Sequence, residues 1–356
     1  MHSQKSQRLF LDMLKGIAVF LMLWGHCIQC SMGGTEPDFF ENPVFRLIYS
    51  FHMPLFMLIS GYLFYYSFGK RDMKELILHR SKPLLSTIVF CGILIYYATD
   101  GVIGLLQGDF GALLLGKWLE SLSGLWFLWA VLTASLIVAV IGKTVKQVWL
   151  QVLVLLLCTP LLLLFPNGIM AVYMYPYFLI GFYYAQYGSR IPRIVSYMRY
   201  LSLPLFPLLM LFFEKKHYIY TTGIFGSAYS IGEYAEINLF RWTIGGVGSI
   251  FAITLAELCF RLFTEKRSKP LLSMGLAKMG GCSLQIYALS TIFVSFYLPL
   301  LAEKVAELLG GNAFAQPVWL YSFGIALPIS IAASFGLYGL VKLCDKIGLG
   351  KILFGR

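Results

Sequence analysis

Long apolar runs constrain this chain more than any other feature of its sequence. Ten runs reach or approach the roughly 20 mainly apolar residues that a membrane-spanning helix needs. Of the 356 residues, 58% are hydrophobic and 13% are charged, whereas a soluble domain carries about 25% charged residues. We expect lipid to cover the apolar surface that a soluble core could not bury. The predicted spans are residues 9–30, 44–68, 83–99, 122–142, 147–166, 169–187, 199–213, 240–262, 282–301 and 318–343.

The distribution of basic residues predicts how the chain is oriented. Lys and Arg gather in alternate loops, with 21 on one side of the predicted membrane, six on the other, and Lys15 inside the first span. Because basic loops stay in the cytoplasm, we expect both termini there. The net charge of +11 follows from these short loops, so we expect no nucleic-acid partner. The predicted fold is an all-α polytopic membrane protein with about ten transmembrane helices, forming one membrane-embedded domain over residues 1–356.

The first span carries unusual ionisable residues. Such groups are costly within a membrane, so they are candidates for function. His26 follows Lys15 by eleven positions, which places both on nearly the same helical face, about 16 Å apart. Asp12 can pair with Lys15 or with Arg8. These three could instead form a structural ion cluster, and His26 could simply be hydrogen-bonded inside the bundle. A neutral imidazole is the usual proton acceptor near pH 7, which favours a catalytic role for His26.

The cysteines do not indicate a metal or disulfide site. Cys27 and Cys30 follow His26, but this is not the order of a haem-attachment motif, and no second pair of metal ligands accompanies it. The seven cysteines are scattered, and most lie inside apolar runs, where a thiol behaves as a small hydrophobe. We therefore expect no bound metal and no disulfide framework.

Further polar residues mark the second and third spans. His52 could face His26 across a cavity, or it could be structural. Ser60 precedes a glycine and favours close helix packing. Arg80 and Lys82 lie just before Pro83, where we expect the third helix to begin. Cations at the membrane edge suit a polyphosphate ligand, but they could equally be determinants of topology.

These motifs together resemble the acyltransferase 3 family of integral membrane acyltransferases. The basic residue, ten intervening residues and histidine of the first helix match Lys15 and His26, and the acid before them matches Asp12. The resemblance extends over about residues 8–290. Its other elements are Phe51, Pro54, Leu55, Phe56, Ser60 and Gly61 in the second helix, Arg80, Lys82 and Pro83 before the third, Leu125–Leu128, and Ser283–Tyr287.

The resemblance implies transfer of an acyl group, most often acetyl, from cytoplasmic acyl-CoA to a hydroxyl of a cell-surface glycan or glycolipid. It implies a multi-pass protein of the plasma membrane, with acyl-CoA as co-substrate, no permanently bound cofactor, and membrane lipid and a lipid-linked or free sugar acceptor as partners. The implied roles are general base for His26, supported by Lys15 and Asp12; donor binding for Arg80, Lys82 and Arg8; and a substrate path along His52, Phe51, Ser60, Trp126 and Tyr287.

Four alternatives remain open at the level of sequence. The chain could be a transporter or flippase for a glycan or lipid, although no internal repeat supports that. It could be a silent membrane scaffold, or His26 could carry the acyl group covalently. The outer segment 214–241 could bind a sugar through its tyrosines and carboxylates, or it could merely cover the bundle.

Overall fold

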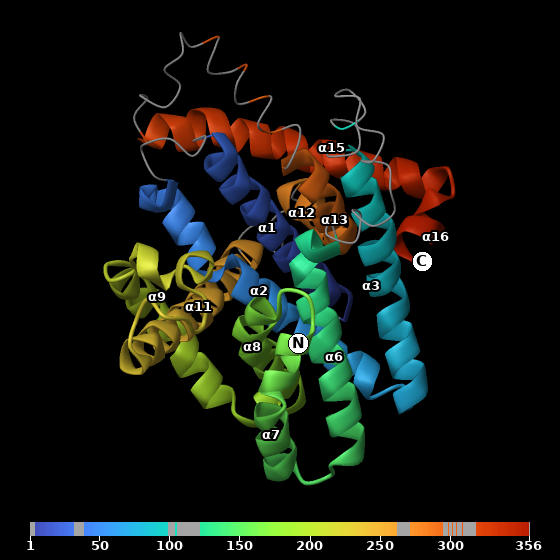
Figure 1. Cartoon of the computed structure of the whole chain (residues 1–356), viewed down its shortest axis with the longest axis vertical. Coiled ribbons are helices and arrows are strands. Elements are labelled where there is room, and N and C mark those ends of the chain that lie inside the picture. Colours follow the sequence, from blue (N-terminus) through green and yellow to red (C-terminus); the bar gives the residue numbers. More distant parts are fainter. Residues whose placement is uncertain are drawn as a thin grey trace. The chain divides into compact units, whose positions relative to one another are not determined.

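The computed structural model describes residues 4–31, 39–98, 122–261, 271–294 and 318–355, with residues 104, 298, 301, 304 and 308 between them. Over these residues the secondary structure is helical and no strand occurs (Figure 1). The α-helices are α1 (Gln4–Ser31), α2 (Pro43–Phe68), α3 (Met73–Tyr96), α6 (Trp126–Thr144), α7 (Val148–Leu157), α8 (Gly168–Tyr187), α9 (Pro192–Met210), α10 (Ile219–Thr222), α11 (Ile231–Phe260), α12 (Leu271–Gly280), α13 (Ser283–Ile292), α15 (Leu327–Lys346) and α16 (Leu349–Phe354).

The chain divides into two compact units, each built from separate stretches of sequence. The first unit comprises Met1–His52, Cys91–Ser121 and Ala252–Ile352. The second comprises Met53–Phe90, Leu122–Phe251 and Leu353–Arg356. The boundary at His52 falls inside α2, so the two ends of one helix contribute to different units.

In the first unit, α1 packs against α12, α13 and α15. Two glycines allow the close approach of α1 and α12. A Cβ atom on Gly16 would collide with the backbone of Leu276, and one on Gly280 would collide with the backbone of Asp12. Small residues at such crossings are how membrane helices gain packing contacts, because lipid gives them no hydrophobic reason to associate.

In the second unit, α6 packs against α8, and α7 returns beside α6 (Figure 1, green). The C-terminal part of α2 crosses α8 at close range, and glycines allow this approach as they do between α1 and α12. A Cβ on Gly61 would collide with the carbonyl of Phe178, and one on Gly181 with the carbonyl of Leu58. The predicted packing role of the Ser60–Gly61 pair is therefore confirmed for the glycine.

Six helical stretches are long and apolar enough to cross a membrane, judged by length and composition. They belong to the predicted class of all-α polytopic membrane proteins, and each overlaps a predicted span. The count of ten and the cytoplasmic termini stay predictions, as does the single domain. The six stretches are Ser6–Gln29, Pro43–Phe68, Met73–Tyr96, Leu122–Thr144, Ile231–Phe260 and Leu320–Lys346.

Several predicted boundaries were wrong, and local chemistry explains each. The third helix begins at Met73 rather than at residue 83, because the Asp72 carboxylate accepts a hydrogen bond from the Glu75 N–H at 2.7 Å and caps it. Pro83 lies inside this helix, at the cost of one backbone hydrogen bond. The run 147–166 is interrupted after α7 and continues as a 3₁₀-helix, Thr159–Leu164, that begins next to Pro160.

The later boundaries shift for similar reasons. Helix α9 begins at Pro192, which suits the first turn of a helix, rather than at residue 199. Ser230 and Glu233 form a capping box, with the Ser230 N–H donating to the Glu233 carboxylate at 2.8 Å. Helix α11 therefore starts at Ile231, and the outer loop is shorter than the predicted 214–241. The run at 282–301 is helical over Ser283–Ile292, and most of its residues from 295 to 301 lie outside the described ranges.

Candidate functional site

Helix α1 holds the ion pair that the sequence offered as one of two possibilities. The Lys15 Nζ lies 2.7 Å from Asp12 Oδ1, so the acid pairs with the lysine that follows it by one turn. The Lys15 side chain is 19% exposed and that of Asp12 is 40% exposed. Arg8 has an exposed side chain in the same helix.

His26 is half-buried near the other end of α1, and one of its ring nitrogens is held in place. His26 Nδ1 lies 3.2 Å from Gln29 Oε1 and 3.2 Å from the Tyr49 hydroxyl. Tyr49 also donates to Gln29 Oε1 at 3.3 Å, which closes a three-membered network. Because an amide oxygen can only accept a hydrogen bond, the contact with Gln29 requires the proton on Nδ1.

The other ring nitrogen of His26 therefore carries a lone pair. Among the residues that the structure describes, Nε2 has no hydrogen-bond partner. A histidine whose Nδ1–H is fixed and whose Nε2 is free has the tautomer and orientation required of a proton acceptor. The adjacent Cys27 is a buried free thiol, and the side chain of Cys30 lies outside the described residues.

A glycine makes room for the tyrosine that contacts His26. A Cβ atom on Gly25 would lie 2.5 Å from Tyr49 Cε2, so only glycine allows the ring to lie against α1 at this level. The Tyr49 ring stacks on Phe45, with centroids 3.9 Å apart and an interplanar angle of 23°. Tyr49 and Gln29 were both missed from the sequence as site residues, although Gly25 beside His26 was a signal for close approach.

The Tyr49 ring lies next to both His52 and His26. The His52 ring centroid is 4.8 Å from that of Tyr49, and the Tyr49 centroid is 6.1 Å from that of His26. His52 Nδ1 donates to the carbonyl of Ile48 at 2.8 Å, and the side chain is 2% exposed. The hydrogen bond to its own helix fixes the His52 ring and gives it a packing role beside Tyr49.

The two candidate donor-binding cations do not share a helical face. Residues two apart on an α-helix point about 200° apart. Arg80 is half-buried, donates from Nε to Ser135 Oγ at 3.2 Å, and lies over the Phe64 ring at 5.8 Å. Lys82 is exposed. Arg80 therefore faces α6, while Lys82 points away from it.

The candidate path residues fall into both units. Phe51 and Tyr287 belong to the first unit and are buried, at 7% and 8% exposure. Ser60 and Trp126 belong to the second. The Ser60 hydroxyl donates to the Phe56 carbonyl at 2.9 Å, within its own helix, and Trp126 packs edge-on against Phe127. The structure thus joins Asp12 to Lys15, and it joins His26 to His52 through Tyr49. Ser60 and Trp126 make these contacts within their own helices.

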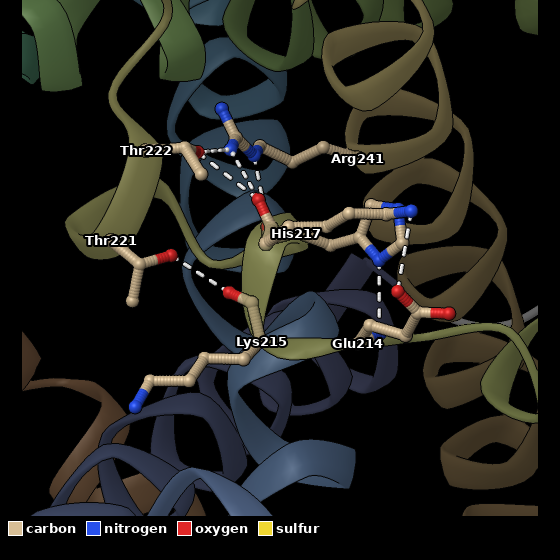
Figure 2. Close-up of polar contacts among 7 residues, drawn as sticks. Glu214, Lys215, His217, Thr221, Thr222 and Arg241 are labelled. Atoms are coloured by element: carbon tan, nitrogen blue, oxygen red, sulfur yellow. Dashed lines mark hydrogen bonds and ion pairs between the residues drawn. The ribbon is translucent and has the colours of Figure 1, made fainter. Parts of the chain in front are cut away.

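The outer segment before α11 is folded around a buried arginine. Arg241 is 1% exposed, and Figure 2 shows its side chain reaching the carbonyl of His217 and the hydroxyl of Thr222. Its guanidinium also donates to the carbonyls of Gly223 and Lys216. The side-chain oxygen of Asn238 is a further acceptor, and the Tyr173 ring lies 5.8 Å from Cζ. This network favours the structural reading of the segment over a loose sugar-binding loop.

His217 is a titratable residue of this segment and lies outside the candidate spans. It is 6% exposed, and its Nδ1 accepts a hydrogen bond from the Glu214 N–H at 2.9 Å, as part of a capping box (Figure 2). Burial lowers the pKa of His217 from 6.5 to about 4, and the Lys216 ammonium acts in the same direction. The ring is therefore neutral at pH 7 and able to accept that hydrogen bond.

Comparison with known proteins identifies the domain. A family model described as an acyltransferase domain matches residues 8–339. A nodulation protein NolL of Sinorhizobium fredii is 33% identical over 187 residues, which cover 49% of this chain and 48% of the relative. A nodulation protein NolL of Mesorhizobium japonicum is 29% identical over 188 residues, covering 50% and 48%. The chain thus aligns with about half the length of these relatives. No solved structure matches it.

Proposed function

Since the chain belongs to the acyltransferase family that this domain defines, we propose that it is a membrane O-acyltransferase with His26 as its general base. The proposed donor is acyl-CoA, with acetyl as the group moved. The proposed acceptor is a hydroxyl of a glycan or glycolipid at the plasma membrane. The observation that carries the proposal is the His26 imidazole, held at Nδ1 by Gln29 and Tyr49 with Nε2 free.

In the proposed reaction, Nε2 removes the proton of the acceptor hydroxyl as its oxygen attacks the thioester carbonyl. The tetrahedral intermediate then collapses, the carbon–sulfur bond breaks, and the proton held on Nε2 passes to the departing thiolate. An ester and free coenzyme A result, and the imidazole returns to its starting state. Such positioned proton transfer contributes about 10²–10⁴-fold to a rate.

The remaining site residues have supporting roles in this proposal. Lys15, paired with Asp12, places a cation on the His26 face of α1, where it would help to bind the donor. Arg80, Lys82 and Arg8 would contact the phosphates of coenzyme A, with Arg80 acting from the α6 side of its helix and Lys82 from the opposite side.

The test is acyl transfer by the purified chain in lipid nanodiscs, with acetyl-CoA labelled in the acetyl group. Without an identified acceptor, water takes its place, and release of the coenzyme A thiol reports hydrolysis. His26→Ala should lower this rate by at least about 100-fold, because no other group replaces the base. His79→Ala, which removes an exposed histidine, is the matched control and should leave the rate unchanged.

Comparing the masses of surface glycans from cells with and without the gene would then identify the acceptor. A gain of one acetyl group that depends on His26 supports the proposal. A His26→Ala variant that hydrolyses acetyl-CoA at the full rate contradicts it, and acetyl-independent movement of a labelled lipid would favour a flippase.

A further inference from the structure

A π-helical turn, η11 (Leu320–Ala326), lies at the start of the helix that continues as α15. The Leu327 N–H bonds to the carbonyl of Ser322, five residues back, which widens the helix by one residue. The same carbonyl accepts a hydrogen bond from the Trp24 indole N–H at 3.0 Å. Such turns are uncommon and frequently occur at functional sites, because they re-aim side chains at a cost in helix geometry.

The turn binds α1 on both sides of His26. Trp24 lies two residues before His26, and its ring packs edge-on against Phe323 at 5.3 Å. Cys27 follows His26, and its carbonyl accepts a hydrogen bond from the Tyr321 hydroxyl at 3.3 Å. Contacts that flank His26 on α1 restrict both rotation and sliding of the helix at this level.

The turn also binds the start of α2, the helix that carries Tyr49. Asn42 Oδ1 accepts hydrogen bonds from the N–H groups of Val44 at 2.9 Å and Phe45 at 3.1 Å, so Asn42 caps α2. Its Nδ2 donates to Ser322 Oγ at 3.0 Å. Both side chains are buried, at 2% exposure for Asn42 and 0% for Ser322. Tyr49 follows this anchor by two helical turns, so the anchor sets its height relative to α1.

We propose that the π-helical turn is a positioning element, in which Ser322 holds the His26 helix through its carbonyl and the Tyr49 helix through its hydroxyl. Neither Ser322 nor Asn42 touches the reacting atoms. They act through the contact between Tyr49 and His26 Nδ1, which fixes the imidazole for proton transfer. This inference rests on the proposed role of His26 as base, and it adds the residues that align it.

The test separates the hydroxyl of Ser322 from its carbonyl. Ser322→Ala removes only the hydrogen bonds between the Ser322 hydroxyl and the Asn42 side chain. It should lower kcat for acetyl-CoA turnover on the order of tenfold, with KM unchanged, since misplacement of a catalytic group costs rate rather than affinity. Ser334→Ala is the matched control. It also removes a buried serine hydroxyl from this helical stretch, but one that donates to the Ser330 carbonyl in its own helix, and it should leave kcat unchanged.

A second pair of variants separates alignment from helix capping. Asn42→Ser retains an N-cap side chain but is too short to keep the bond to Ser322, whereas Asn42→Ala loses both. Asn42→Ser should therefore match the loss of kcat seen in Ser322→Ala while the thermal unfolding midpoint stays close to that of the parent chain. Asn42→Ala should lower kcat and the unfolding midpoint together.

A double-mutant cycle gives the decisive readout. If Ser322 acts through Tyr49, then Ser322→Ala should have little further effect in a Tyr49→Phe background, because coupled residues are not additive. Losses that multiply independently would overturn the proposal, as would a Ser322→Ala variant that behaves like Ser334→Ala. Failure of the general-base assignment is a different result, in which His26→Ala itself keeps full activity.

Discussion

Two polar clusters in this protein, one buried around Arg241 and one half-buried around His26, differ in how completely their hydrogen bonds are satisfied. Around Arg241, the donors of the guanidinium reach three carbonyls, one hydroxyl and one side-chain amide oxygen. Around His26, Nδ1 is held by two neighbours while Nε2 stays without a partner among the described residues. The donors of the Arg241 guanidinium are all used within the protein, whereas Nε2 of His26 is still available as a hydrogen-bond acceptor.

The comparison distinguishes a buried charge that shapes the fold from a half-buried ring that can accept a proton. Burying a polar group costs free energy unless the group is hydrogen-bonded. A buried polar side chain with a structural role is therefore expected to have its donors and acceptors paired. The His26 ring is half-buried, and its Nε2 keeps a lone pair that a substrate hydroxyl could use. On this basis we assign Arg241 to the architecture of the outer segment and His26 to the reaction.

The largest expected effect concerns Arg241. Replacing it with Met would leave the carbonyls of Lys216, His217 and Gly223 without their donor in a buried setting. We expect a loss of stability on the order of 4 kcal/mol, because several charge-assisted hydrogen bonds are lost together. Thermal or denaturant unfolding in detergent would measure it, with the exposed Arg193→Met as control. A variant as stable as this control would show that the network is dispensable.

The next effect concerns the space beside His26. Gly25→Ala would place a methyl group against the Tyr49 ring, which must then move from Nδ1. We expect acetyl-CoA turnover to fall by about 100-fold, since displacement of a catalytic group by about 1 Å can cost that much. Gly339→Ala adds the same methyl to an open position of α15 and should leave turnover unchanged. Equal rates in both variants would show that Tyr49 does not position His26 for the reaction.

The smallest effect is a pH dependence that belongs to the outer segment. The pKa of His217 falls from 6.5 to about 4 on folding, so the unfolded chain binds more protons between these values. Stability should therefore decline as pH is lowered from about 6.5 towards 4. His217→Asn keeps a neutral acceptor for the Glu214 N–H and should flatten this slope, as unfolding midpoints across the window would show. If His217→Asn left the pH dependence of the unfolding midpoint unchanged, the lowered pKa of His217 would not be its cause.

Features that depend on spacing along one helix could be predicted from the sequence. Spacing along one helix was enough to offer Asp12 as a partner for Lys15 and to place His26 on the same face, and the 2.7 Å ion pair confirms that pairing. Capping residues such as Asp72, Ser230 and Glu233 could have corrected the helix starts, because their spacing is a local signal as well.

Contacts between distant segments were not predictable in the same way. Tyr49 lies two residues before the motif that begins at Phe51, but its bond to His26 depends on how α1 and α2 pack, and Gly25 was the one local hint. Arg241 counted only as one of few basic residues on the outer side, since nothing nearby in sequence shows that carbonyls surround it. The π-helical turn joins Ser322 to Asn42 and Trp24 across almost 300 residues, and no periodicity indicates it.

The most direct test of the central claim is the protonation of the His26 ring. Nitrogen-15 spectra of histidine-labelled protein in nanodiscs distinguish the two neutral tautomers, and a His26→Ala sample assigns the signal. We predict a neutral ring at pH 7 with the proton on Nδ1 and a bare Nε2, shifted in Tyr49→Phe. A proton on Nε2, with Nδ1 bare, would contradict the assignment of His26 as the base.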